Sequence, residues 1–143
     1  MAKRILVPLD RSDTAESMLP LVGDLARGSG ATVRLLHVAP IPQMRLGEYG
    51  RVVAYENQEM ERLESSGLEH LQGAEAYLEG VPIEHVVRFG DPVNEIVYEA
   101  DAFGADLIAL ATSRRGWLRR GLGGVADKVF RKTGVPTILL GTR

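Results

Sequence analysis

The feature that most constrains the fold is a short apolar run, Asp106–Ala111 (DLIALA), which contains no polar alternation. A strand with this pattern is covered on both faces, as the central strands of parallel sheets are. A loop rich in glycine and arginine follows, and the next segment, VADKVFRK, has the pattern of a helix. Together this strand, loop and helix predict a protein of the α/β class.

The rest of the chain repeats the alternation of strand and helix. Each predicted strand is a short apolar run, and the five runs are Arg4–Leu9, Ala31–Val38, Ile83–Phe89, Asp106–Ala111 and Thr137–Leu140. Helical patterns lie between them, at residues 12–28, 53–78, 91–104 and 125–132. This order predicts a doubly wound five-stranded parallel sheet with right-handed crossovers and helices on both faces.

Local signals refine the expected helices. Ser12 and Asp13 are candidate caps of the first helix, and Pro20 is expected to kink that helix near its middle, because proline removes a backbone hydrogen bond. Asp91 is the predicted N-cap of the third helix, with Pro92 in the first turn. The boundaries of that helix therefore follow from its own residues.

Length and composition predict one domain that spans residues 1–143. Hydrophobic residues make up 45% and charged residues 25%, which is typical of a globular chain. A net charge of −2 argues against nucleic acid as a partner. No apolar run approaches the ~18 residues of a membrane span, and the N-terminus lacks the pattern of a signal peptide. With no cysteine for disulfides or thiol chemistry, these features predict a cytoplasmic protein.

The loop after Ala111 is the predicted binding site. Its glycines allow tight turns, its arginines carry positive charge, and the helix that follows presents N–H groups that favour anions. Asp10 and Val38 end other predicted strands and would lie at the same edge of the sheet, so a phosphate-containing ligand fits this edge. The alternatives are a loop without a ligand whose arginines are solvated, and a loop that docks a protein or nucleic-acid partner.

Other chemistry finds little support. No GxxxxGK[ST] motif is present and no GxGxxG follows the first strand, which argues against an NTPase or a dinucleotide enzyme. No serine elbow or catalytic triad is evident, and the histidines lack the spacing of metal ligands. We therefore predict no catalytic residue and no metal ligand. His37 is expected to pack near a strand end, and His70 and His85 are expected to be exposed.

A receiver domain that accepts a phosphoryl group is the rival from another class, because it shares the doubly wound layout. It would use Asp10 or Asp91 as the phosphate acceptor, together with Mg²⁺. Asp10 has no adjacent acidic residue, however, and no lysine follows the last strand. Helix capping alone explains Asp91.

The chain resembles the universal stress protein family along its whole length. The segments that carry the resemblance are ILVPLDRSDTAE, LLHVAP, RFGDPVNEIVYEADAFGADLIALAT and GGVADKVFRKTGVPTILL. The resemblance implies a strand order of 3-2-1-4-5, a homodimer, stress-linked regulation and an adenine nucleotide as ligand, ATP or AMP, with Mg²⁺ only beside ATP. The nucleotide-binding residues that it implies are Pro8, Asp10, Val38, Ala111, Arg114, Arg115, Gly123, Gly124 and Val125.

The phosphate loop departs from the pattern of nucleotide-binding members of that family, G-x2-G-x9-G-[S/T]. Ala111 and Arg114 stand at the first two glycine positions, the loop is one residue short, and Gly124 follows Gly123 where Ser or Thr is usual. Because Cβ atoms restrict the approach of backbone to phosphate, we predict weak or absent ATP binding. The alternative is a genuine ATP or AMP site in which Arg114 and Arg115 form a phosphate clamp. Both versions predict regulation, with slow ATP hydrolysis at most.

The last predicted strand is the expected dimer contact. At the outer end of the order 3-2-1-4-5 it would expose unpaired backbone groups and apolar side chains. Antiparallel pairing with the same strand of a second copy would cover both, through Thr137, Ile138, Leu139 and Leu140. The family resemblance implies the same homodimer and leaves room for an unknown protein partner.

Overall fold

The computed structural model describes residues 2–10, 16–42, 51–113 and 124–142. Five parallel strands form one sheet in the order β3-β2-β1-β4-β5, which confirms the predicted fold class and strand order. The strands are β1 (Arg4–Pro8), β2 (Thr32–Ala39), β3 (Ile83–Phe89), β4 (Leu107–Ser113) and β5 (Thr137–Thr142). The first strand along the chain is therefore the central strand of the sheet.

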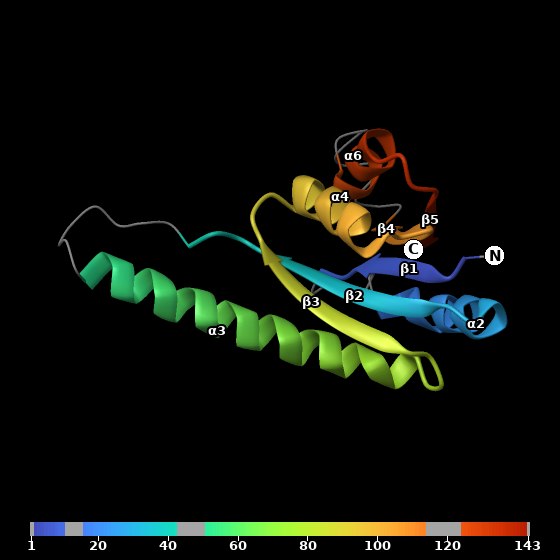
Figure 1. The fold of residues 1–143 in the computed structure, drawn as a ribbon, viewed down its shortest axis with the longest axis horizontal. Coiled ribbons are helices and arrows are strands. Elements are labelled where there is room, and N and C mark those ends of the chain that lie inside the picture. Colours follow the sequence, from blue (N-terminus) through green and yellow to red (C-terminus); the bar gives the residue numbers. More distant parts are fainter. Residues whose placement is uncertain (1, 11–15, 43–50, 114–123, 143) are drawn as a thin grey trace.

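Helices cover both faces of this sheet, as Figure 1 shows. α2 (Leu19–Ser29) and α3 (Arg51–Ala74) lie on one face, and α4 (Pro92–Phe103) and α6 (Val125–Lys132) lie on the other. Successive residues of a strand point to opposite faces, so Ile5 and Val7 pack on the α2 and α3 side, whereas Leu6 packs on the α4 and α6 side. The sheet thus separates two apolar clusters.

The first helical region differs from its predicted form. Glu16 and Ser17 are helical, a turn occurs at Met18, and α2 begins at Leu19 with Pro20 in its first turn. The expected mid-helix kink at Pro20 is therefore wrong: a proline is tolerated in the first turn because the N–H that it lacks has no helical partner there. The predicted caps Ser12 and Asp13 lie outside the described residues.

α3 is the longest helix, at 24 residues and about 36 Å. It ends at Ala74, and a 3-10 turn, η1 (Glu75–Tyr77), continues the chain to the predicted helix end at residue 78. Gly67 lies where α3 meets His37 of β2 and Val87 of β3. A Cβ atom at residue 67 would be 2.9 Å from His37 Cδ2 and 3.0 Å from Val87 Cγ2, so the close approach requires glycine.

The later helices begin as predicted. The Asp91 side chain accepts a hydrogen bond from the backbone N–H of Asn94 at 3.0 Å, and Pro92 is the first residue of α4. Gly104 ends α4 with a φ of 68°, in the left-handed region that favours glycine. α6 starts at Val125, the predicted position. No helix among the residues described here is long and apolar enough to cross a membrane.

Candidate functional site

The carboxyl edge of the sheet opens between β1 and β4. These two strands pair only at Ile5 with Leu107 and at Leu6 with Ile108, although β1 continues to Pro8 and β4 to Ser113. Pro8 has no backbone N–H to extend a ladder. The strand order also reverses direction at this point, and in doubly wound sheets the crevice beyond such a switch point is where ligands bind.

Val38 presents backbone groups toward this crevice. The last bond between β1 and β2 runs from Leu9 N to Leu36 O, at 2.8 Å, so the N–H and C=O of Leu36 face β1. In a parallel strand the residue two positions on faces the same way, and Val38 therefore directs its N–H and C=O past the end of β1. Its side chain packs with the apolar cluster under α4. The predicted role of the Val38 backbone stays a prediction, and the register is compatible with it.

Asp10 follows the end of β1 and is exposed. Its backbone C=O lies 3.0 Å from Nε2 of His70 on α3, and the preceding C=O, of Leu9, lies 3.3 Å from Nδ1 of His37 on β2. A carbonyl oxygen only accepts, so both ring nitrogens carry a proton in these contacts. The two imidazole rings also meet edge to face, with centroids 5.7 Å apart.

The histidine expectations are therefore corrected in part. His37 packs near a strand end, as predicted, but His70 is half-buried and contacts Asp10. His85 is also half-buried, and its Nε2 lies 2.5 Å from Oε1 of Glu75. Both departures arise because α3 and η1 fold back along β2 and β3, which the helical period alone does not reveal.

The described ends of the predicted phosphate loop have ordinary geometry. Ala111 pairs with Leu140 of β5 and packs against the apolar cluster under α2 and α3. Gly124 is the N-cap of α6 with a φ of −72°, and a Cβ there would meet no atom within 4 Å. Glycine is therefore not required at residue 124 by conformation or by space. Val125 opens α6 and is exposed, while Arg114, Arg115 and Gly123 lie outside the described residues.

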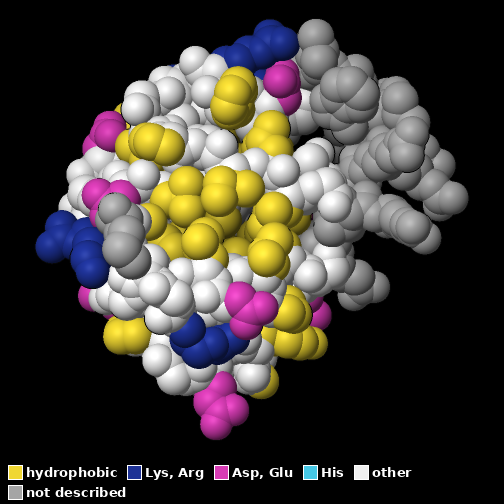
Figure 2. All heavy atoms as spheres, turned by 90° about the vertical axis from the view of Figure 1, so that its right-hand side faces the viewer, with side chains coloured by type: hydrophobic (Ala, Val, Ile, Leu, Met, Phe, Trp, Pro, Cys, Tyr) yellow, Lys and Arg dark blue, Asp and Glu magenta, His cyan; other side chains and the backbone are white. Residues whose placement is uncertain are grey.

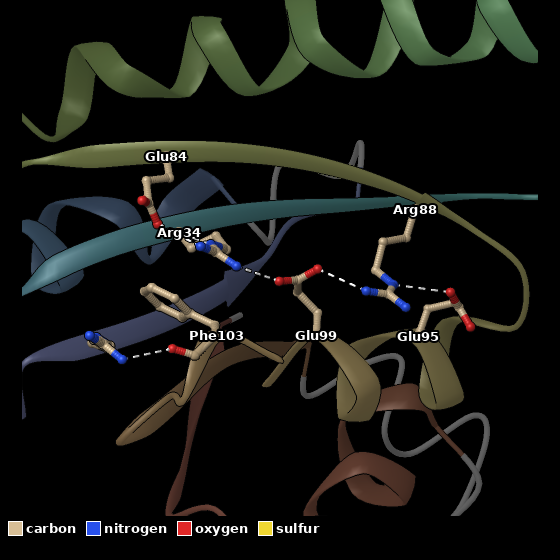
Figure 3. A network of polar contacts seen from close by, with 7 residues as sticks. Arg34, Glu84, Arg88, Glu95, Glu99 and Phe103 are labelled. Carbon is tan, nitrogen blue, oxygen red and sulfur yellow. Dashed lines mark hydrogen bonds and ion pairs between the residues drawn. The ribbon is translucent and has the colours of Figure 1, made fainter. Parts of the chain in front are cut away.

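A buried charge network on the other side of β2 and β3 was not predicted. Figure 3 shows the Glu99 carboxylate of α4 between Arg34 of β2 and Arg88 of β3. Oε2 of Glu99 lies 2.6 Å from Nη1 of Arg34, and Oε1 lies 3.0 Å from Nη1 of Arg88. The Glu99 side chain is 5% exposed. The outer carboxylates Glu84 and Glu95 complete the network, at 3.0 Å from Arg34 and 3.1 Å from Arg88.

The network holds its arginines in the charged form. Partial burial acts against the charge of Arg34, but hydrogen bonds and charges from Glu99 and Glu84 outweigh it and raise the pKa of Arg34. The hydrogen bond from Glu99 is the main reason that the pKa of Arg88 is also raised. Arg34 in addition lies over the Phe103 ring, at 4.1 Å from its centroid. A sequence signal was available, because both arginines interrupt apolar strand runs.

A groove of about 380 Å³ lies at the opposite, amino edge of the sheet. It is lined by Arg4, Thr32, Arg34, Glu84, Ala102 and Phe103. Its charged side chains are already engaged: Arg34 holds Glu84 and Glu99, and Nη1 of Arg4 donates to the Phe103 carbonyl at 3.3 Å. The groove is therefore distinct from the predicted site at the carboxyl edge.

Metal-dependent phosphorylation gains no support from the described geometry. Asp91 uses its carboxylate to cap α4, and the described residues contain no group of three or more His, Asp or Glu that could hold a metal ion.

Comparisons with known proteins identify relatives along the whole chain. The model of the Universal stress protein family matches residues 1–140. Universal stress protein MJ0577 of Methanocaldococcus jannaschii is 28% identical over 98% of this chain and 95% of the relative. A solved structure of MJ0577 has a TM-score of 0.82 at 26% identity, covering 99% of this chain and 96% of that one. The universal stress protein from Archaeoglobus fulgidus in complex with dAMP has a TM-score of 0.65 at 25% identity, covering 96% of each chain.

Proposed function

Since this chain belongs to the universal stress protein family, we propose that it is a regulatory protein that binds an adenine nucleotide weakly at the carboxyl edge of the sheet. The observation that carries the proposal is the pair of backbone groups that Val38 directs past the end of β1, beside Asp10. The Archaeoglobus relative in complex with dAMP supports an adenine nucleotide as the ligand class. In the proposed site, Val38 and the Asp10 carboxylate form the base-recognition end.

The low affinity follows from three differences in the phosphate loop. Ala111 stands at the first glycine position of the family pattern, Arg114 stands at the second, and Gly124 carries no hydroxyl. Loss of one neutral hydrogen bond to phosphate costs about 0.5–1.5 kcal/mol, and more when the acceptor is charged. The second version of the proposal keeps the affinity through a clamp of Arg114 and Arg115, which can form charge-assisted contacts.

Calorimetry with ATP, ADP and AMP at low and at physiological salt tests the proposal. Weak binding that Asp10→Ala weakens further, to a level that is still measurable, supports a degraded site. Tighter binding at low salt that weakens steeply with salt, and that the Arg114→Ala, Arg115→Ala double variant abolishes, supports the clamp. Submicromolar ATP affinity that does not change with salt contradicts both versions. ATP titrations are repeated with Mg²⁺, which we propose only as a companion of ATP.

We also propose a homodimer through β5, in a cytoplasmic protein. β5 pairs with β4 on one side only, and Leu139 is 39% exposed on this edge strand. Figure 2 shows hydrophobic side chains gathered on the side of the molecule where α2 and β5 lie in Figure 1. A second copy paired along Thr137, Ile138, Leu139 and Leu140 would cover the strand edge.

Light scattering at micromolar concentration tests the dimer. Ile138→Lys is expected to give monomers. Leu139→Lys is the second variant, because the Leu139 side chain is more exposed than that of Ile138 and its replacement disturbs the core less. A wild-type protein that is monomeric at this concentration would contradict the proposal.

A further inference from the structure

We propose that His70 is a positioning residue of the nucleotide pocket, which fixes the place of Asp10 by holding its backbone carbonyl. The inference rests on the proposed function and adds a residue that the family pattern does not contain. It starts from the contact between His70 Nε2 and Asp10 O, at 3.0 Å, which joins the C-terminal part of α3 to the end of β1.

The close docking of α3 makes this contact geometrically demanding. Gly67 lets the helix backbone approach His37 and Val87, where a Cβ would come within 3.0 Å. His70 is three residues further along α3, so it lies on the same side of the helix, one turn nearer its C-terminal end. The position of the His70 ring is therefore set by the packing of α3 on the sheet.

The end of β1 needs such support because its strand ladder has stopped. The pairing of β1 with β4 ends at Leu6, Pro8 lacks an N–H, and the last bond to β2 is made by Leu9 N. Beyond that bond, His37 Nδ1 approaches the C=O of Leu9 and His70 Nε2 approaches the C=O of Asp10. Two donors from different elements thus hold the carbonyls on either side of the Asp10 Cα atom, from which the carboxylate side chain extends.

The edge-to-face contact between the rings adds a second constraint. His37 lies against Gly67 and against His70, with ring centroids 5.7 Å apart in the latter pair. His37 therefore restricts the ring plane of His70. A residue that fills the space of His70 without an N–H donor would keep the packing of α3 but would lose the hydrogen bond to the Asp10 carbonyl.

The test compares His70→Leu with His70→Gln, whose amide N–H₂ can replace the Nε2–H donor. AMP affinity is measured by NMR titration at low salt, and thermal unfolding reports on stability. We expect His70→Leu to weaken AMP binding about fivefold or more, as loss of one hydrogen bond does. His70→Gln should stay within about twofold of the wild type. His85→Leu is the matched control, because His85 is also half-buried but contacts Glu75 instead; it should leave AMP affinity unchanged.

A double-variant cycle separates positioning from general destabilisation. In an Asp10→Ala background, His70→Leu should cause no further loss of AMP affinity, since the group that it positions is absent. Additive losses, unchanged affinity in His70→Leu, or failure of His70→Gln to restore binding would each overturn the inference while leaving the proposed function intact. A wild type that binds no adenine nucleotide would overturn the proposed function, and the inference with it.

A measurement on the unaltered protein guards against a variant that does not fold. Nitrogen-15 NMR of the histidine rings at pH 8 identifies the protonated nitrogen of each ring. We expect the proton of His70 on Nε2, as a donor to a carbonyl requires. Protonation on Nδ1 alone would overturn the proposed contact independently of any nucleotide.

Discussion

On the face covered by α2 and α3, the sheet is packed by apolar residues and by an approach so close that a Cβ at residue 67 would displace its neighbours. On the face covered by α4 and α6, a similar apolar cluster shares its space with a carboxylate buried between two arginines. The packing of the helices depends mainly on shape on the first face, and on both shape and charge on the second. The difference matters for the site because the close packing of α3 brings His70 to the end of β1, whereas the charge network joins α4 to β2 and β3.

On the face covered by α4 and α6, burial determines how much an ion pair contributes to stability and how much stability is lost when one partner is removed. A buried pair adds little net stability when it is compared with apolar residues of the same volume, because removing charges from water is costly. Removing one partner is far more damaging, since the other charge is then left buried. Arg34 and Arg88 share Glu99, so a single substitution there leaves two charges without their common partner.

The largest expected effect is that of Glu99→Leu. It should lower the free energy of unfolding by about 3 kcal/mol, near the low end for a broken buried pair, because Glu84 and Glu95 still contact the arginines. Urea denaturation monitored by circular dichroism measures the change. Glu84→Leu is the control: its side chain is 48% exposed, and the loss should stay below about 1 kcal/mol.

The triple variant Arg34→Met, Glu99→Leu, Arg88→Met tests whether the network as a whole adds stability relative to apolar residues in its place. If the network acts through mutual compensation, this variant should recover part of the stability lost in Glu99→Leu, because both arginines that paired with Glu99 are removed with it. The recovery is partial because Glu84 and Glu95, whose side chains are 48% and 17% exposed, lose their arginine partners. A triple variant that is less stable than Glu99→Leu would show that the network contributes net stability.

Gly67→Ala tests the face that is fixed by shape. The added methyl group meets His37 and Val87 at about 3 Å, and overpacking of this kind costs about 1–3 kcal/mol. Gly73→Ala in the same helix is the control, since a Cβ there meets no atom within 4 Å, and it should stabilise the protein by about 0.5–1 kcal/mol. Opposite signs in the two urea midpoints are expected. Equal signs would contradict the close contact at Gly67.

Gly124→Ser has a smaller effect on stability and tests the phosphate loop. A serine fits at this N-cap without strain and should stabilise α6 by a few tenths of a kcal/mol. If the proposed pocket lacks only this hydroxyl at its helix end, AMP affinity should rise by about two- to tenfold, as one added hydrogen bond allows. Unchanged affinity in calorimetry would show that Ala111 and Arg114 limit binding.

The smallest expected effect is that of Asp106→Asn, an exposed counterpart of Glu99. The N–H groups of Lys3 and Arg4 donate to its carboxylate, at 2.8 and 2.9 Å, and lower the pKa of Asp106 below 3.8. Because the folded pKa is the lower one, the stabilisation is complete above pH 3.8 and is lost as pH falls through the folded value. The difference between wild type and Asp106→Asn should therefore be constant from pH 7 to 5 and shrink below pH 4. A difference that grows in acid would reverse the assigned sign.

The sequence predicted those parts of the fold whose signals are local. β3 and α6 have their predicted bounds, and Asp91 caps α4, because each depends on neighbours in the chain. The strand order was implied by the family resemblance and is confirmed. The mid-helix kink expected at Pro20 was wrong because the helix is interrupted at Met18 and begins again at Leu19, which places Pro20 in a first turn.

The missed features depend on residues far apart in the sequence. Arg34 and Glu99 are 65 positions apart, and His70 and Asp10 are 60 apart. Helical period separates buried from exposed positions, but it does not tell which polar residue of α3 reaches the end of β1. The predicted roles of Pro8, Asp10, Val38, Ala111, Gly124 and Val125 stay predictions, as do those of Arg114, Arg115 and Gly123 in the loop.

Because the central strand β1 is made first, the two faces of the sheet can be covered at different times during synthesis of the chain. Arg34 leaves the ribosome 65 residues before Glu99, which takes roughly 3 to 13 s at ordinary rates of synthesis. During that interval α2, β2, α3 and β3 can assemble on one side of β1, while Leu6 and Leu36 have no helix to cover them. Because charged side chains disfavour association of an open sheet with other chains, Arg34, joined by Arg88 only 11 residues before Glu99, would keep this side charged until α4 covers it.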